Sequence, residues 1–385
     1  MHGRMIGYGI VLLVLTLVPI AEGRERWSEK QAAAWGKKIP WLVGANYTPA
    51  TAINQLEMWQ ADTFDPKQID RELGWAASLG FNSMRVFLHH LLWEQDSQGL
   101  LDRMEQFLKI AERHKIGVMF VLFDSCWDPN PKLGKQRAPS KGVHNSGWVQ
   151  SPGSADLQDE KRHKLLQKYV EGVIGRFKDD PRVQVWDVWN EPDNTNDKSY
   201  GKDHLKQELP NKHALTLRLL KLAMGWARAA NPSQPITSGV WLSGHKAHPK
   251  QLNPFEVVQI TESDIITFHA YDPLPGVKAW LAHLKMYDRP ILCTEFMARP
   301  NGSRFDPILG YLKEQKVGAY CWGFVAGKTN TIFAWDTWQR PEKAAEPKVW
   351  FHDILRKDGT AFAEAEVAYI RRITGAKQSA PEAPR

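Results

Sequence analysis

The sequence predicts an α/β fold in which eight parallel strands and the helices between them close into one (β/α)8 barrel, the TIM-barrel architecture. Strand-like apolar runs alternate with amphipathic helical stretches along the chain. Two long segments without periodicity follow the third and eighth of these runs, and the length of 385 residues suits one barrel with long loops. Because parallel strands with right-handed crossovers close most simply into a barrel, we expect a single domain.

The predicted strands are short runs of mainly apolar and β-branched residues. They cover residues 41–47, 82–88, 117–124, 183–190, 236–242, 265–271, 291–296 and 319–325. In a barrel of this kind the active site is built from the carboxyl ends of the strands and the loops that follow them.

The first predicted helix, residues 66–79, has Asp65 as its N-cap, Pro66 at its first position and Gly80 after its end. Comparable apolar periodicity predicts helices over residues 101–113, 160–177, 215–230, 277–286 and 306–314. The link between the fifth and sixth strands has no clear pattern. Long loops are predicted at residues 125–159 and 327–358, and both leave carboxyl ends of strands.

The amino terminus has the pattern of a signal peptide. Arg4 precedes an apolar run over residues 6–20, and the small residues Ala21 and Gly23 follow it. The run is shorter than the roughly 20 residues that a membrane-spanning helix needs. We therefore expect residues 1–23 to be a cleaved signal for secretion or periplasmic export, with an uncleaved membrane anchor as the alternative. The barrel domain is predicted over residues 24–375, and residues 376–385 are expected to form a disordered tail.

Charge and cysteine content exclude several function classes. The formal net charge is +7, but Lys and Arg are spread along the chain without a basic run, so no nucleic-acid partner is expected. The three cysteines, Cys126, Cys293 and Cys321, form no C-x-x-C pair. We expect them to be free, buried and inert, with a disulfide between Cys293 and Cys321 as the alternative. No cofactor or metal ion is predicted.

Two glutamates stand at predicted strand ends. Glu191 follows the fourth strand in the segment Trp-Asn-Glu-Pro, and Glu295 lies near the end of the seventh. Residues on these two strands face each other across the mouth of an eight-strand barrel. Glycoside hydrolysis needs such a pair, one carboxylic acid to protonate the leaving oxygen and one carboxylate to attack the anomeric carbon.

The triplet Asn190-Glu191-Pro192, with Glu295 about a hundred residues later, resembles the acid/base motif and nucleophile of the retaining glycoside hydrolases of clan A. Within that clan the chain is most similar to family 5, the cellulase and β-mannanase family, over residues 41–325. The resemblance implies a retaining β-glycoside hydrolase that acts on β-linked oligosaccharides or polysaccharides of glucan or mannan type. Glu191 would be its acid/base and Glu295 its nucleophile, through a covalent glycosyl-enzyme intermediate.

The resemblance also implies binding residues around the two glutamates. Arg85 would contact the nucleophile, His269 and Tyr271 would lie beside it, Asn190 would bind the sugar 2-hydroxyl, and Trp322 would form the floor of the sugar site. The alternatives are that Arg85 makes a structural salt bridge and that His269 is a buried histidine whose ring nitrogens are bonded. Family 5 usually has a histidine after the third strand, whereas this chain has Cys126 and Trp127 there.

Tryptophan is abundant, with 17 residues. Most are expected in the core, but Trp127, Trp148 and Trp322 lie at or after predicted strand ends and are candidates to stack on sugar rings.

Two other classes of function stay open on the sequence alone. A metal-dependent hydrolase is suggested by His89, His90, Asp124 and His269, all near strand ends. Against it, His89 and His90 would point to opposite faces if the second strand continued that far, and zinc-type ligand spacings are absent. A barrel that binds carbohydrate without cutting it is the other alternative, against which stands the intact pair of glutamates.

Overall fold

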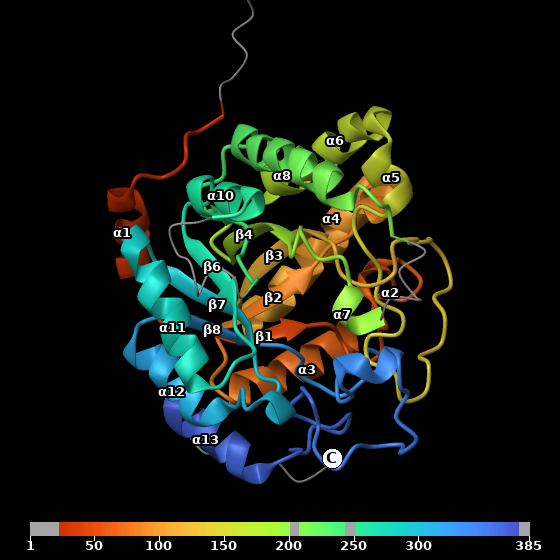
Figure 1. The fold of residues 1–385 in the computed structure, drawn as a ribbon, viewed down its shortest axis with the longest axis vertical. Helices are drawn as coiled ribbons and strands as arrows, with labels where there is room; N and C mark the ends of the chain where they lie inside the picture. Colours follow the sequence, from red (N-terminus) through yellow and green to blue (C-terminus); the bar gives the residue numbers. More distant parts are fainter. Residues whose placement is uncertain (1–22, 201–207, 243–251, 377–385) are drawn as a thin grey trace, which may run out of the picture.

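A computed structural model describes residues 23–200, 208–242 and 252–376, and it confirms the (β/α)8 barrel (Figure 1). The sheet has eight strands in the order β5-β4-β3-β2-β1-β8-β7-β6, and every pairing is parallel. An isolated bridge between Val240 and Phe268 links the two outer strands of this order, which brings the barrel close to closure. The predicted signal peptide and tail fall outside the described residues, except for Gly23 and Ala376.

The strands lie where the sequence predicts them: β3, β4 and β7 have the predicted bounds, and the other five are shorter than predicted. They are β1 (Val43–Tyr47), β2 (Ser83–Phe87), β3 (Gly117–Asp124), β4 (Val183–Asn190), β5 (Ile236–Thr237), β6 (Ile266–His269), β7 (Ile291–Phe296) and β8 (Gly318–Cys321). The expectation of a fifth strand over residues 236–242 was wrong. The Ser238 N–H donates to the Ser263 side chain, and the Gly239 carbonyl accepts from the Gln259 side chain, so strand pairing is interrupted after Thr237. It resumes only at Val240, which bridges to Phe268 of β6.

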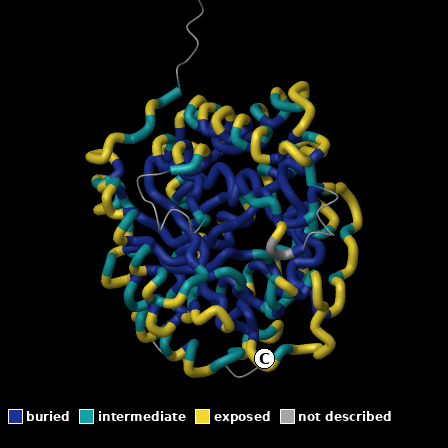
Figure 2. The backbone as a smooth tube through the Cα atoms, viewed as in Figure 1, coloured by how far each residue is buried: buried dark blue, intermediate teal, exposed yellow. Residues whose placement is uncertain are grey.

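Helices fill the links between strands and cover the outside of the barrel (Figures 1 and 2). They are α1 (Glu29–Lys38), α2 (Gln55–Trp59), α3 (Pro66–Ser78), α4 (His90–Arg113), α5 (Ser154–Gln158), α6 (His163–Phe177), α7 (Asp197–Tyr200), α8 (Lys212–Ala229), α10 (Pro254–Thr261), α11 (Leu274–Leu284), α12 (Phe305–Glu314) and α13 (Glu364–Thr374). None of the helices in the described ranges is both long and apolar enough to cross a membrane.

The sequence analysis predicted no helix at α1, α2, α5, α7 or α13, and two further helices differ from the expectation. α4 begins at His90 instead of residue 101, because two helical segments join across a kink at Asp96, whose φ is −162°. α10 occupies the fifth link, where no pattern was evident. Asn253 and Glu256 form a capping box at its start, with Pro254 in its first turn, and this local capping defines the short helix.

The lower part of the barrel interior is a packed apolar layer. Buried side chains within six of the strands, or directly before them, meet there: Leu42, Met119, Val185, Ile265, Leu292 and Tyr320. Figure 2 shows the same organisation, with buried backbone along the strands and exposed backbone on the outer helices. Because the bottom is filled, the hollow part of the barrel is its carboxyl end, where the long loops lie.

Asp353, in the loop after β8, is a buried carboxyl whose effect on stability can be measured. Burial raises the pKa of Asp353 to about 6. Its Oδ2 accepts from the Thr331 hydroxyl at 2.6 Å, while Oδ1 has no hydrogen-bond partner among the described residues. A carboxyl whose pKa is higher in the folded state favours folding below its unfolded pKa, and this contribution is lost as the pH rises towards the folded pKa.

We therefore expect Asp353→Asn to become progressively more stable than the wild type between about pH 4 and pH 6. The difference should approach about 3 kcal/mol, because each pKa unit corresponds to about 1.4 kcal/mol. Urea unfolding of both proteins across this pH range measures it. A stability difference that does not change with pH would show that Asp353 titrates normally in the folded protein.

Candidate active site

A pocket of about 500 Å³ opens at the carboxyl end of the barrel, and both Glu191 and Glu295 line it. Its other walls come from the loops after β3, β4, β5, β6 and β8. Volumes of roughly 300 to 1,000 Å³ are usual for small-molecule sites. The place of the pocket agrees with the expected position of an active site in this fold.

Glu295 lies within β7, and both of its carboxylate oxygens accept hydrogen bonds. Oε1 accepts from Arg85 Nη1 at 2.8 Å, and Oε2 accepts from the Tyr271 hydroxyl at 2.7 Å. Burial raises the pKa of Glu295, and the carboxylate of Glu191 adds to this effect. His269, Arg85 and Tyr271 act in the opposite direction and favour the ionised form. The site thus holds one carboxylate between a cation and a phenol.

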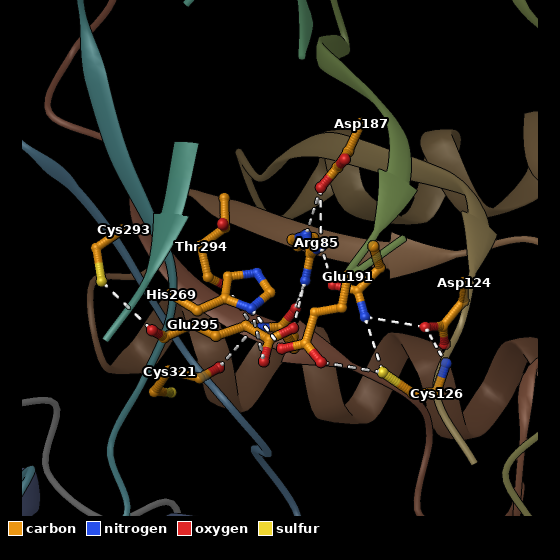
Figure 3. A network of polar contacts seen from close by, with 12 residues as sticks. Arg85, Asp124, Cys126, Asp187, Glu191, His269, Cys293, Thr294, Glu295 and Cys321 are labelled. Carbon is orange, nitrogen blue, oxygen red and sulfur yellow. Dashed lines mark hydrogen bonds and ion pairs between the residues drawn. The ribbon is translucent and has the colours of Figure 1, made fainter. Parts of the chain in front are cut away.

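Arg85 is fully buried at the centre of a polar network (Figure 3). Its Nε and Nη2 donate to Asp187 Oδ2 at 3.0 and 2.8 Å, and Nη1 also donates to Asn46 Oδ1 at 2.7 Å. Nη2 donates in addition to Asn190 Oδ1 at 2.7 Å. The two interpretations of Arg85 therefore hold together, because the same guanidinium makes a structural salt bridge and contacts Glu295.

Glu191 directly follows β4 and has φ of +46°, a left-handed conformation that residues other than glycine rarely adopt. Such backbone outliers cluster at functional sites. Its Oε2 accepts from Asn194 Nδ2 at 2.7 Å and lies 3.3 Å from Cys126 Sγ, and its Oε1 lies 2.8 Å from His269 Nδ1. Among the described residues, Glu191 thus contacts an amide, a thiol and an imidazole, whereas Glu295 contacts a guanidinium and a phenol.

His269 lies between the two glutamates. Its Nδ1 is 2.8 Å from Glu191 Oε1 and 3.5 Å from Glu295 Oε2. Burial lowers the pKa of His269 to about 4, so the ring is neutral near pH 7. The other ring nitrogen, Nε2, is buried without a hydrogen-bond partner among the described residues. The ring is therefore not a fully bonded core histidine.

One oxygen from each of Glu191 and Glu295 and a ring nitrogen of His269 lie within 4.8 Å of one another. Such a set could hold a metal ion by its donor types. However, both oxygens of Glu295 already accept hydrogen bonds, one of them from the guanidinium of Arg85. A cation would have to displace these donors and would be repelled by Arg85, so the arrangement fits a metal-free carboxylate pair better.

The other residues considered for a metal site lie apart from this set. His89 and His90 were expected to point to opposite faces only if the second strand continued that far, but β2 ends at Phe87, and the two rings stack with centroids 4.8 Å apart. His90 Nε2 contacts Asp156 at 2.8 Å, and His89 Nε2 contacts the Gln150 carbonyl at 3.0 Å. Both histidines are thus engaged in holding the loop after β3.

Asp124, at the end of β3, organises one wall of the site. Its Oδ1 accepts from Asn190 Nδ2 at 2.9 Å, and its Oδ2 accepts from Trp148 Nε1 at 2.6 Å. Burial raises the pKa of Asp124 to about 6. Asn190 is thus bonded to the protein at both ends of its amide. Binding of a sugar 2-hydroxyl by Asn190, which remains a prediction, would share the amide with Asp124.

All three cysteines are free and buried, as expected. Cys126 nevertheless belongs to the site, because it lines the pocket and its Sγ lies 3.3 Å from the carboxylate of Glu191. Cys126 lies two residues after the end of β3, where active-site residues are expected. The interpretation of Cys126 as an inert thiol did not take this position into account. Two further residues were missed, Asn46 at the end of β1 and Asp187 within β4. Asp187 could have been found as a charged residue inside an apolar strand.

The aromatic residues divide into a front and a back layer. Trp127 and Trp322 line the pocket, as does Trp335, which the sequence analysis did not single out. Trp335 packs edge-on to Tyr271 with centroids 4.9 Å apart. Trp148 is 2% exposed and lies behind Trp322, at a centroid distance of 6.0 Å. The geometry therefore offers Trp127, Trp322 and Trp335 for contact with a ligand, with Trp148 supporting Trp322.

No family model matches the sequence, and no curated protein matches it. Solved structures do resemble the fold. Exo-β-1,4-mannosidase Op5Man5 from Opitutaceae bacterium strain TAV5 superposes with a TM-score of 0.56 at 19% identity, over 87% of this chain and 60% of that chain. This chain therefore spans less than two thirds of that protein's length.

Two further structures extend the comparison. A variant of GH5_18 from Bifidobacterium longum subsp. longum ATCC 55813, in complex with Manβ1-4GlcNAc, has a TM-score of 0.55 at 12% identity, over 90% of this chain and 81% of that chain. The β-1,4-D-mannanase from Cryptopygus antarcticus has a TM-score of 0.51 at 14% identity, over 74% of this chain and 84% of that chain. At these identities the likeness establishes the shared barrel fold.

Proposed function

We propose that this protein is a retaining β-glycoside hydrolase that acts on β-linked oligosaccharides or polysaccharides of glucan or mannan type. The observation that carries the proposal is the unequal pair of buried carboxylates in one pocket. Glu295 is held by Arg85 and Tyr271, whereas Glu191 is held by Asn194, His269 and Cys126. Two carboxyl groups in different electrostatic surroundings suit the separate roles of nucleophile and acid/base.

In the first step, Glu295 attacks the anomeric carbon as the bond to the leaving oxygen breaks, and Glu191 gives that oxygen its proton. The product is a glycosyl ester of Glu295. In the second step, Glu191 takes a proton from water, whose oxygen attacks the anomeric carbon and releases Glu295 as a carboxylate. Two inversions at one carbon leave the β configuration unchanged.

The spacing of the pair supports retention. Carboxyl groups in retaining enzymes lie about 5 to 5.5 Å apart, against about 6.5 to 9.5 Å in inverting ones, which need room for water. Here one carboxylate oxygen of Glu191 and one of Glu295 lie within 4.8 Å of each other. The names of the structural neighbours, a mannosidase and a mannanase, favour β-mannosides as the first substrates to test.

The proposal is tested by incubating the protein with a panel of aryl β-glycosides and β-linked polysaccharides that includes mannosides and glucosides. Proton NMR of the first product should show the β anomer before mutarotation. A chelator should leave the rate unchanged, whereas loss of activity with EDTA would favour the metal-dependent alternative. Binding of the polysaccharides without any turnover would favour a carbohydrate-binding barrel.

We further propose that the protein is exported and that its mature form begins near Arg24. Residues 1–22 lie outside the described part of the chain, so the support is the sequence pattern together with the placement of Arg24. Its guanidinium makes an ion pair with Asp264 and donates to the Pro232 carbonyl, so the first mature residues would lie against the barrel. Amino-terminal sequencing of secreted protein should begin near Arg24. Recovery of Met1 in a membrane fraction would instead support the anchor.

A further inference from the structure

The pocket is closed on one side, where the loop after β3 (residues 125–153, the β3 loop) meets the loop after β8 (residues 322–363, the β8 loop). Figure 1 shows these yellow and blue segments side by side, next to α7. The backbone N–H of Asn145 donates to the Thr329 carbonyl at 2.8 Å, and the backbone N–H of Glu342 donates to the Gly142 carbonyl at 3.0 Å. His144 Nδ1 lies 2.8 Å from the Phe333 carbonyl. The two loops are therefore joined by backbone contacts.

Packing between the joined loops leaves no passage at two points. Trp127 of the β3 loop stacks on Trp338 of the β8 loop at a centroid distance of 5.7 Å, and Tyr200 packs edge-on to Trp338 at 4.6 Å. At Gly142, an added Cβ would lie 2.0 Å from the Glu342 carbonyl oxygen. The β3 and β8 loops thus form a wall, and a glycan chain could not continue through it.

Asn145 lies in this wall and has an unusual side chain. It is fully buried, and neither its Oδ1 nor its Nδ2 has a hydrogen-bond partner among the described residues. Buried polar groups are normally bonded, and leaving both ends of an amide unpaired is costly. Asn145 lines the pocket that contains both glutamates. Its side-chain amide therefore holds a donor and an acceptor that no described residue uses, and these match the acceptor and donor of a pair of sugar hydroxyls.

If Trp322 forms the floor under the attacked sugar, as the sequence resemblance implies, the wall lies on the side of that sugar. Asn145 and Trp322 also share a small cavity next to the main pocket, so they are neighbours. On the other side, Glu191 is followed by Asn194 and by Asp193, which binds Trp241 Nε1 at 2.5 Å. Because Glu191 must face the leaving oxygen, the leaving group extends towards Asp193 and Trp241. The ring that carries the anomeric carbon then lies between Trp322 and Asn145.

We infer that the pocket accepts a single terminal sugar unit and that the amide of Asn145 recognises hydroxyls at the non-reducing end of that unit. This inference rests on the proposed glycoside hydrolase function. A chain that continued beyond this sugar would meet the joined loops, so the protein removes terminal units and does not cut internal bonds. Asn145 is a specificity-determining residue in this arrangement.

The product pattern tests the closed end. A β-linked oligosaccharide labelled at its reducing end should lose one sugar at a time, giving only the monosaccharide and a ladder of labelled products. The same oligosaccharide with its non-reducing 4-hydroxyl methylated should resist hydrolysis. Aryl β-monoglycosides serve as the reference, because their turnover with retention tests the proposed function by itself. Cleavage of the capped oligosaccharide, or early release of larger fragments, would overturn the inference while leaving that function intact.

The role of Asn145 is tested with Asn145→Gly, which deletes the amide and tolerates the φ of +43° at this position. The value of kcat/KM for the aryl β-monoglycoside should fall about 10-fold to 100-fold, as expected when hydrogen bonds to a ligand are lost. The matched control is Asn231→Gly, an exposed asparagine with φ of +52° at the end of α8. Its kcat/KM should equal that of the wild type.

The thermal stability of Asn145→Gly shows whether Asn145 recognises the ligand or supports the fold. Because the side-chain amide of Asn145 bonds to none of the described residues, its loss should lower Tm by no more than the loss in Asn231→Gly. Unchanged kinetics in Asn145→Gly would exclude recognition by the amide. A fall in Tm well beyond that of the control, with activity lost in proportion to unfolded protein, would make Asn145 structural and would also overturn its assignment.

Discussion

Glu295→Ala is expected to abolish turnover of every substrate, with kcat reduced by at least about 10⁴-fold, the scale on which removal of a nucleophile acts in other hydrolases. The reason is that Glu295 would form the covalent bond to the anomeric carbon, so no substrate can bypass it. Steady-state kinetics with an activated aryl glycoside, and with an oligosaccharide, measure the effect. The matched control is Glu364→Ala, an exposed glutamate in the first turn of α13, which should behave as the wild type.

Glu191→Ala should fail in a different way. Proton transfer contributes about 10²-fold to 10⁴-fold, and only where the leaving group needs the proton. Substrates with good leaving groups should still glycosylate Glu295, and the trapped intermediate should then react with added azide to give a β-glycosyl azide. Because the side chain of Glu191 is removed, azide can approach the anomeric carbon without repulsion from its carboxylate.

The two variants together decide the roles. If azide restores turnover of Glu295→Ala and the product is an α-glycosyl azide, azide has replaced the missing carboxylate in a single inverting step. This result would identify Glu295 as the nucleophile. Azide rescue that gives the β product in Glu191→Ala identifies the acid/base. If instead Glu295→Ala retained activity on activated substrates while Glu191→Ala lost all turnover, the roles would be the reverse of those proposed.

Arg85→Met is expected to destabilise the protein by about 3 to 5 kcal/mol and to remove activity. Arg85 is 0% exposed and lies 2.8 Å from both Asp187 and Glu295, so its loss leaves two buried carboxylates unpaired. The free energy of unfolding in urea at pH 7 measures the effect. The control is Arg176→Met, whose ion pair with Glu105 is at the surface and should contribute no more than about 1 kcal/mol.

Two further variants test the cause. Arg85→Met combined with Asp187→Asn removes one of the unpaired charges and should recover part of the stability, but not the activity, because Glu295 still lacks its cation. Arg85→Lys keeps the charge and loses the planar fork that reaches four partners, so it should be intermediate in stability. If Arg85→Met unfolded at the same urea concentration as the wild type, the hydrogen-bond network of Arg85 would not contribute to the stability of the fold.

The sequence by itself determined the architecture and singled out the two glutamates that we propose as the catalytic pair. Alternation of strand and helix patterns predicted the barrel because each element carries its own periodicity, and short-range patterns need no knowledge of distant contacts. Glu191 and Glu295 were identifiable because strand ends in a barrel converge on one mouth. Where a backbone bonds to distant side chains, as after β5, local pattern overestimated the strand.

Only the tertiary structure decided how the site is assembled. The partners of Arg85 come from β1, β4 and β7, and such contacts between distant segments leave no trace in local periodicity. Cys126 appeared inert from its sequence because its approach to Glu191 depends on how two loops fold. The junction of the β3 and β8 loops, and the unpaired amide of Asn145 within it, arise from aperiodic segments. Their conformation is set by packing against each other, which neither segment encodes alone.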